Sequence, residues 1–121
     1  MREENVFEQK IREDNKMTKI TVDSVICGFT HTINGKLNDD KIIIDIESPC
    51  EKIKGFSHME VPMMEIFGID DNYVIRKAKD AKCSSTCLIP CAVLHMCSLE
   101  AGFMSKNLAE NSGSISINFE P

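Results

Sequence analysis

The chain is poor in aromatic residues, has no tryptophan and carries no excess of positive charge. Its 121 residues include one Tyr and six Phe, and 14 basic residues are outnumbered by 19 acidic ones, giving a formal net charge of −5. Nucleic-acid-binding proteins usually carry a basic stripe, so this balance argues against a nucleic-acid partner. No apolar run approaches the roughly 20 residues that a membrane-spanning helix requires, so we expect no membrane association.

Several common catalytic signatures are also missing. The sequence contains no GxGxxG, P-loop, GxSxG or HExxH motif, so the enzyme classes that use them are not indicated. The first residues, MREENVFEQK, lack the apolar segment of a secretory signal. We therefore expect a cytoplasmic protein whose thiols stay reduced. The alternative is an oxidising compartment, in which six cysteines could form three disulfides.

The composition changes at Met17, which is also an alternative start. Residues 1–16 carry nine charged side chains and few hydrophobic ones, which predicts a flexible, charged N-terminal tail. Residues 17–121 have the length of one domain, and the 42% hydrophobic content of the chain is sufficient for one core. The sequence thus predicts a tail followed by a single domain.

Two segments with strand character predict an antiparallel hairpin. Residues 19–33 are rich in β-branched side chains, with a change of phase near Ser24 that indicates a bulge or bend. Residues 41–47 alternate isoleucines with acidic residues and form the return strand. Asn34-Gly35 and residues 38–40 have the composition of turns. Residues 114–119 alternate Ile and Phe with polar residues, which predicts a C-terminal strand.

Helical signals occupy the region between these strands. We expect a short helix that starts at Ser48-Pro49 and ends at Gly55, and a second over residues 61–67. A third, capped by Asp70 or Asp71, would run through Ala81. The clearest pattern spans residues 90–103, with Gly102 as its stop signal. The predicted class is α+β: an antiparallel β-hairpin plus a C-terminal strand in a small sheet, with three to four helices packed on one face.

The six cysteines are the main chemical feature of the sequence. The faces of the predicted hairpin set a register that places Cys27 opposite Ser48 or Cys50, at the open end of the hairpin. Cys87 and Cys91 flank the start of the longest predicted helix, where unpaired N–H groups and the helix dipole favour a thiolate. Thiolates gathered from remote segments are the ligands of zinc and of iron–sulfur clusters.

We therefore take Cys27, Cys50 and Cys87 as the central ligands of an iron–sulfur cluster or a zinc ion. Both groups commonly have four protein ligands, and the fourth is open between Cys83, Cys91 and His95, which follows Cys91 by four residues. The candidate metal ligands among the thiols are Cys27, Cys50, Cys83, Cys87 and Cys91.

Other noticeable residues have simpler explanations. Cys97 borders the buried stripe of the long helix, and His31 lies on the apolar face of the first strand, so both are expected in the core. The seven methionines indicate adaptable packing more than copper binding. The acidic pairs at residues 39–40 and 70–71 fit turns and helix caps.

Three short elements resemble the NifU-like iron–sulfur cluster assembly scaffolds. They are Cys27-Gly28, Cys50 after IIIDIESP, and Cys87 within TCLIP. The resemblance implies a cluster held by these three cysteines. The chain departs from that family at Phe29, where an acidic residue is expected, and at Thr86, where a histidine is expected, and it lacks the chaperone-binding Leu-Pro-Pro-Val-Lys segment. The chain also resembles small uncharacterised prokaryotic proteins with ICGF, SxC and CxxP elements.

Our leading hypothesis is a non-catalytic metal–thiolate protein that acts in cluster assembly, carriage or electron transfer. Its partner would be a protein that donates or accepts the metal or cluster, and a homodimer is an open alternative. The second hypothesis is a thiol-based sulfur-transfer or redox protein in which Cys87 or Cys91 attacks a disulfide or persulfide sulfur. The third is a metal-free interaction module whose cysteines only pack.

Overall fold

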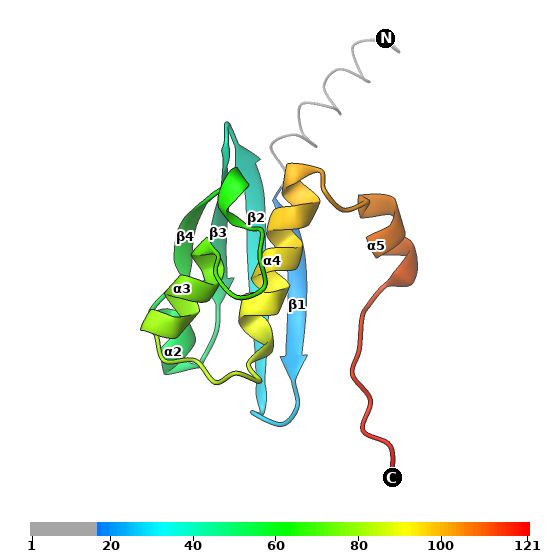
Figure 1. The fold of residues 1–121 in the computed structure, drawn as a ribbon. Coiled ribbons are helices and arrows are strands. Elements are labelled where there is room, and N and C mark those ends of the chain that lie inside the picture. The colour runs from blue at the N-terminus through cyan, green and yellow to red at the C-terminus, as the bar shows by residue number, and fades with distance from the viewer. Residues whose placement is uncertain (1–16) are drawn as a thin grey trace.

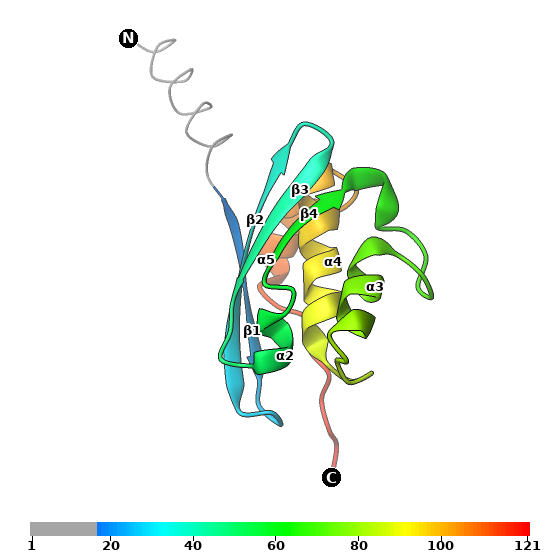
Figure 2. The ribbon, with the colours of Figure 1, turned by 90° about the vertical axis from the view of Figure 1, so that its left-hand side faces the viewer.

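The computed structural model describes residues 17–121, which form a sheet with helices on one side of it (Figures 1 and 2). The flexible tail predicted for residues 1–16 lies outside the described residues. The four strands are antiparallel and follow one another in chain order. They are β1 (Thr18–Ser24), β2 (Phe29–Asn38), β3 (Lys41–Glu47) and β4 (His58–Pro62). The predicted α+β class is confirmed.

Alternation along the strands decides which face of the sheet the helices cover. The inward positions are apolar and fully or almost fully buried, including Ile33, Ile42 and Val61, each with 0% exposure. The outward positions, such as Asn34 and Asp45, are polar and partly exposed. One covered face and one solvated face are typical of antiparallel sheets.

The helices are α2 (Glu51–Lys54), α3 (Tyr73–Asp80), α4 (Leu88–Ala101) and α5 (Lys106–Ser112), with a 3-10 turn η1 (Met63–Glu65) after β4. Helix α4 lies across β1, β2 and β3, and α3 packs against α4 and β4 (Figure 2). Gly102 ends α4 in the left-handed conformation, with φ of 84°, as its position in the sequence predicted. None of the helices within residues 17–121 has the length and apolar character to cross a membrane.

The predicted first strand is in fact two strands. Residues 25–28 form a tight turn between β1 and β2, in which the Gly28 N–H donates to the carbonyl oxygen of Ser24 at 2.8 Å and Gly28 has a φ of 78°. The change of phase near Ser24 therefore marks a reversal of the chain and not a bulge. The β2–β3 ladder ends at the pair Thr32–Glu47. The predicted register is wrong, because Cys27 lies outside this ladder and does not face Cys50 across it.

Asn34-Gly35 is not a turn, because Gly35 lies in the middle of β2, on the inward face. A Cβ atom there would lie 2.4 Å from Cγ of Met96 in α4. The missing side chain lets the helix approach the sheet closely, a common role of glycine within a strand. The turn lies at Asp39 and Asp40 instead, where Asp39 adopts a φ of 59°.

Two further expectations are wrong. The helix predicted over residues 61–67 is absent, because residues 61–62 end β4, whose Met59 and Val61 point inward where it pairs with β3, and residues 63–65 form η1. Residues 114–119 form no strand, and Ile115, Ile117 and Phe119 are 75%, 74% and 80% exposed. The sheet is therefore completed by β4 and not by a C-terminal strand. An alternating pattern becomes a strand only where another strand pairs with it.

The remaining helix boundaries differ from the prediction by a few residues. Asn72 caps α3, with its side-chain oxygen accepting from the Ile75 N–H at 2.9 Å, in place of Asp70 or Asp71. Helix α4 begins at Leu88, two residues before Pro90, and α5 was not predicted. Proline is tolerated throughout the first turn of a helix, so it marks a helix start without fixing the first residue.

Candidate thiol site

One end of the molecule gathers three chain segments that carry cysteines. The β1–β2 turn, helix α2 and the first turn of α4 all lie at the lower end of the molecule in Figures 1 and 2. The β1–β2 turn contains Cys27, Cys50 is the N-cap of α2, and Cys87 is the N-cap of α4. Cys83 lies in the connection between α3 and α4.

Two of these thiols, Cys50 and Cys87, lie near enough to Cys83 to affect it. The pKa of the Cys83 thiol is raised, first by burial and then by the neighbouring sulfurs of Cys87 and Cys50, while Lys52 opposes the shift. Cys87 is also close enough to form a side-chain hydrogen bond with Cys83. We call Cys50, Cys83 and Cys87 the thiol trio. All three are partly buried and pack against the hydrophobic core.

Backbone contacts explain how remote segments meet in the trio. The end of α2 lies against the end of α3, since a Cβ at Gly55 would lie 3.8 Å from Cβ of Ala81. The Cys83 N–H donates to the carbonyl oxygen of Ala78 at 3.0 Å. The Cys87 N–H donates to the carbonyl oxygen of Ser84 at 3.1 Å. The two bonds fix the backbone at Cys83 and Cys87, and the approach of Gly55 to Ala81 places the start of this connection beside α2.

The buried side chain of His31 supports the backbone of Cys50 through Ser48. Ser48 Oγ accepts from the Cys50 N–H at 3.0 Å and lies 2.8 Å from Nδ1 of His31. His31 is 3% exposed, and burial lowers its pKa. The prediction that His31 belongs to the core is confirmed. The sequence also placed Ser48 as the helix cap, whereas its hydroxyl binds the N–H of the actual N-cap, Cys50.

Cys27 lies in the β1–β2 turn, at the same end of the molecule as the trio. It is exposed in the turn, between the exposed residue Ile26 and Gly28. Of the predicted set of Cys27, Cys50 and Cys87, the last two lie near Cys83, which the sequence offered as an optional fourth ligand. Within residues 17–121, no group of three or more His, Cys, Asp or Glu side chains is arranged so that it could hold a metal ion.

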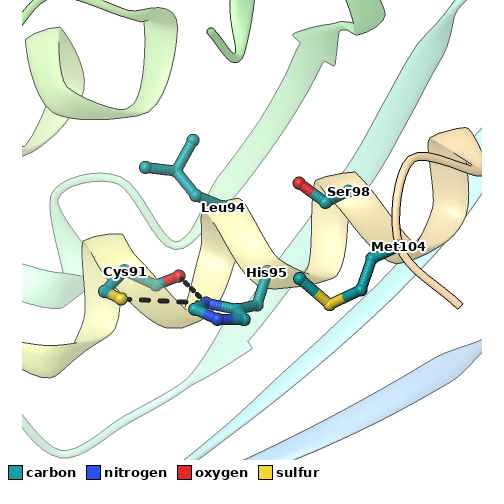
Figure 3. A pocket seen from close by; sticks show the side chains of 5 residues that line it. All are labelled: Cys91, Leu94, His95, Ser98 and Met104. Carbon is teal, nitrogen blue, oxygen red and sulfur yellow. Dashed lines mark hydrogen bonds between the residues drawn. The ribbon is translucent and has the colours of Figure 1, made fainter. Parts of the chain in front are cut away.

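The last two cysteines lie elsewhere on α4. Cys91 is exposed, and its Sγ lies 3.7 Å from Nδ1 of His95, whose Nδ1 is also 2.8 Å from the Cys91 carbonyl oxygen (Figure 3). Cys97 is fully buried, and burial raises its pKa to about 12, so its predicted role in the core is confirmed. All six cysteines are free thiols.

Sequence reasoning missed Cys83 as a central member of the trio and treated it only as an optional fourth ligand. Its spacing from Cys87 was a visible signal, but the position of α2 beside α3 was not. Likewise, His31 of β2 meets Ser48, the residue after β3, only because of the register between β2 and β3.

Comparison with known proteins identifies the family of the chain but not its activity. No curated protein matches this chain, and no solved structure does. The model of a family of unknown function, DUF6951, matches residues 18–112, which include all six cysteines and every strand and helix that the structure describes. The chain therefore belongs to the family of unknown function DUF6951.

Proposed function

We propose that the chain is a small metal–thiolate protein that binds an iron–sulfur cluster or zinc through the thiol trio, with Cys27 as the fourth ligand. The observation that carries this proposal is the convergence of Cys50 with Cys83 and Cys87. Cys50 precedes β4 and α3 in the chain, whereas Cys83 and Cys87 follow them. Sulfur ligands from separate segments are typical of structural zinc and of thiolate-bound clusters.

The chemistry of the trio favours a cation over simple packing. Burial and then the charges of the neighbouring sulfurs raise the pKa of Cys83, because both disfavour its thiolate. A bound metal ion removes the penalty, since it is attracted to all the thiolates and displaces their protons. The trio is also only partly buried, so a metal can reach it from solvent.

The β1–β2 turn supplies both the fourth ligand and a surface for partners. Val25 and Ile26 are 79% and 83% exposed next to Cys27. In this proposal a donor or acceptor protein docks on these apolar side chains and exchanges the metal or cluster. The resemblance to NifU-like scaffolds at Cys27, Cys50 and Cys87 agrees with a role in cluster assembly or carriage. A cytoplasmic location would keep the thiols reduced.

The test is the metal content of protein prepared without oxygen. We expect iron with acid-labile sulfide, or zinc, at one site per chain. Replacing Cys50, Cys83 and Cys87 together with Ser should abolish it, and Cys27→Ser should weaken retention. Cys91→Ser is the matched control, because Cys91 is an exposed thiol outside the trio. Metal-free wild-type protein that also fails to take up zinc or a reconstituted cluster would disprove the proposal.

A second candidate is a dithiol redox protein, favoured by the proximity of Cys83 and Cys87. In that reaction the Cys87 thiolate attacks a disulfide such as oxidised glutathione and releases one thiol. Cys83 then attacks the mixed disulfide, releases the second thiol and leaves a Cys83–Cys87 disulfide. Mass spectrometry after equilibration in glutathione buffers would detect the loss of two hydrogens, and Cys83→Ser should stop the reaction at the glutathione adduct.

A further inference from the structure

Helix α4 carries a second set of sulfur and nitrogen donors, away from the thiol trio. Cys91, His95 and Met104 line a shallow pocket of about 140 Å³, together with Leu94 and Ser98 (Figure 3). We propose that this pocket is a binding site for a soft monovalent cation, Cu(I), with Cys91, His95 and Met104 as its ligands. The residues present combine a thiol, an imidazole and a thioether, which are donors suited to Cu(I).

The imidazole of His95 is already oriented as a metal ligand would be. Its Nδ1 lies 2.8 Å from the carbonyl oxygen of Cys91, which can only accept, so Nδ1 carries the hydrogen. In the neutral ring, Nε2 therefore keeps its lone pair. Metal-binding histidines commonly donate their other N–H to a carbonyl or carboxylate in this way, which fixes both tautomer and ring orientation.

The Cys91 thiol lies beside this ring, with Sγ 3.7 Å from Nδ1. Because Nδ1 donates to the carbonyl oxygen, it does not accept the thiol proton in this arrangement, so the pair is not arranged as a nucleophile and its base. Cys91 is exposed, which leaves its side chain free to rotate toward a bound ion. The pair therefore fits ligation better than nucleophilic catalysis.

The end of α4 brings the third donor to the pocket. After Gly102, the N–H groups of Phe103 and Met104 both donate to the carbonyl oxygen of Ser98, at 2.9 and 3.2 Å. These bonds turn the chain back along the helix. The Met104 side chain consequently lies over α4 and reaches toward His95, as Figure 3 shows.

The kind of donor distinguishes this pocket from the thiol trio. Zinc in proteins is bound by Cys, His and carboxylate side chains, whereas thioethers are ligands of Cu(I). The methionines were expected to serve packing, and fully buried Met96 does so. Met104 is only partly buried and has its sulfur at a pocket with two other donors, so packing alone does not account for it.

The test follows the methionine methyl groups by NMR in the full-length chain, labelled with 13C at the methionine methyls. Cu(I), or redox-inert Ag(I), is added without oxygen, and Met104→Leu assigns the Met104 signal. We expect the Met104 methyl and the His95 ring signals to shift together and to saturate at one equivalent of bound ion at this site. The signal of Met64, an exposed methionine in η1, should stay unchanged.

Single substitutions then measure each ligand. Cys91→Ser, His95→Gln and Met104→Leu should each weaken Cu(I) binding at this pocket at least tenfold in competition with a Cu(I) chelator, while Met64→Leu should not. Because the shift is read at Met104 and His95, Cu(I) that binds the thiol trio does not obscure it. Unmoved Met104 and His95 signals at full occupancy of the protein by Cu(I) would overturn the proposal.

The two proposals can fail separately. Variants of the pocket should keep the iron or zinc content of the trio, and variants of the trio should keep the Met104 shift. If replacement of the trio unfolds the protein, circular dichroism will detect the loss of structure. The Met104 and His95 signals of the wild-type protein then test the Cu(I) site without that variant.

Discussion

At the scale of single residues, a few side chains determine how closely the two layers approach and how the thiol site is supported. Gly35 leaves room for Met96 of α4, and His31 holds Ser48, which in turn holds the backbone of Cys50. Neither Gly35 nor His31 is itself a proposed metal ligand. Both show that the inward face of β2 controls the geometry beneath the helices.

The buried imidazole of His31 should make stability depend on pH. Burial lowers its pKa in the folded state, so below the unfolded-state value of about 6.5 the unfolded chain binds the proton more readily. The contribution of His31 to stability should therefore fall between pH 7.5 and 5.5. His31→Gln should lose less stability than the wild-type protein over the same range, as measured by urea unfolding at both values. An identical pH dependence of the two proteins would contradict this role.

His58 provides the matched comparison, because its environment acts in the opposite direction. Nδ1 of His58 donates a hydrogen bond to the Asp45 carboxylate at 2.7 Å, and this bond and the charge of Asp45 raise the pKa of the exposed imidazole. Its contribution is present at low pH and fades as pH rises through the raised value. His58→Gln should therefore remove a gain in stability at pH 5.5, where His31→Gln removes a loss.

Adding a methyl group at Gly35 should destabilise the protein through Met96. The new Cβ would lie 2.4 Å from Cγ and 2.7 Å from Sδ of that side chain, so Met96 must move. We expect Gly35→Ala to lower the free energy of unfolding by about 1–3 kcal/mol, as overpacking of a core does. Combining it with Met96→Ala should cost less than the sum of the two single variants. Full additivity in urea unfolding would show that the two sites do not interact.

At the scale of elements, the carboxylate of Glu100 joins the end of α4 to three other segments. It accepts from Thr18 Oγ1 of β1 at 2.5 Å and from the Leu37 N–H of β2 at 2.9 Å, and it pairs with Lys106 of α5 at 3.0 Å. Its side chain is only 7% exposed. This contact fixes the upper end of α4 over the sheet, opposite to the thiol trio.

Replacing Glu100 should weaken the junction in a pH-dependent manner. Burial alone would raise the pKa of the carboxyl, but hydrogen bonds from Thr18, Lys106 and Leu37 outweigh it and the pKa is lowered. The stabilisation is thus present above the unfolded-state value of about 4.3 and is lost as pH falls through the folded-state value. Glu100→Gln should cost about 1–3 kcal/mol at pH 7 and less at pH 3.

The exposed residue Glu110 of α5 supplies the control for this variant. Glu110→Gln should leave the free energy of unfolding unchanged within about 0.5 kcal/mol, as surface substitutions usually do. Equal effects of the two substitutions in urea unfolding at pH 7 would mean that the contacts of Glu100 contribute nothing specific.

At the scale of the whole molecule, the core lies between the sheet and helices α3 and α4, and the C-terminal segment takes no part in it. Ile115, Ile117 and Phe119 are at least 74% exposed. Removing residues 114–121 should therefore change the free energy of unfolding by less than about 0.5 kcal/mol. It should also reduce the binding of apolar dyes to the native protein, because three large hydrophobic side chains are removed.

Thermal and urea unfolding of the shortened chain would check this expectation. A matched variant that keeps the full length and carries Ile115→Ser and Ile117→Ser should behave like the truncation. A large loss of stability in either protein would mean that the segment packs against the sheet, as its strand-like pattern first predicted.

The sequence by itself determined the features that depend on neighbours along the chain. The α+β class, strand β3, the end of α4 at Gly102, and the buried positions of His31 and Cys97 follow from periodicity and capping. These signals act within one or two turns of a helix or along a single strand, so no tertiary contact is needed to interpret them.

Only the tertiary structure decided which segments meet. Gly35 lies within a strand, where Met96 of α4 approaches it closely, and pairing with β3 makes residues 61–62 the end of a strand where a helix was predicted. The placement of α2 against α3 brings Cys83 to Cys50 and leaves Cys27 at the tip of a turn. The physical reason is that pairing and packing energies between remote segments exceed the local preferences of the residues involved, and a linear pattern carries no record of those partners.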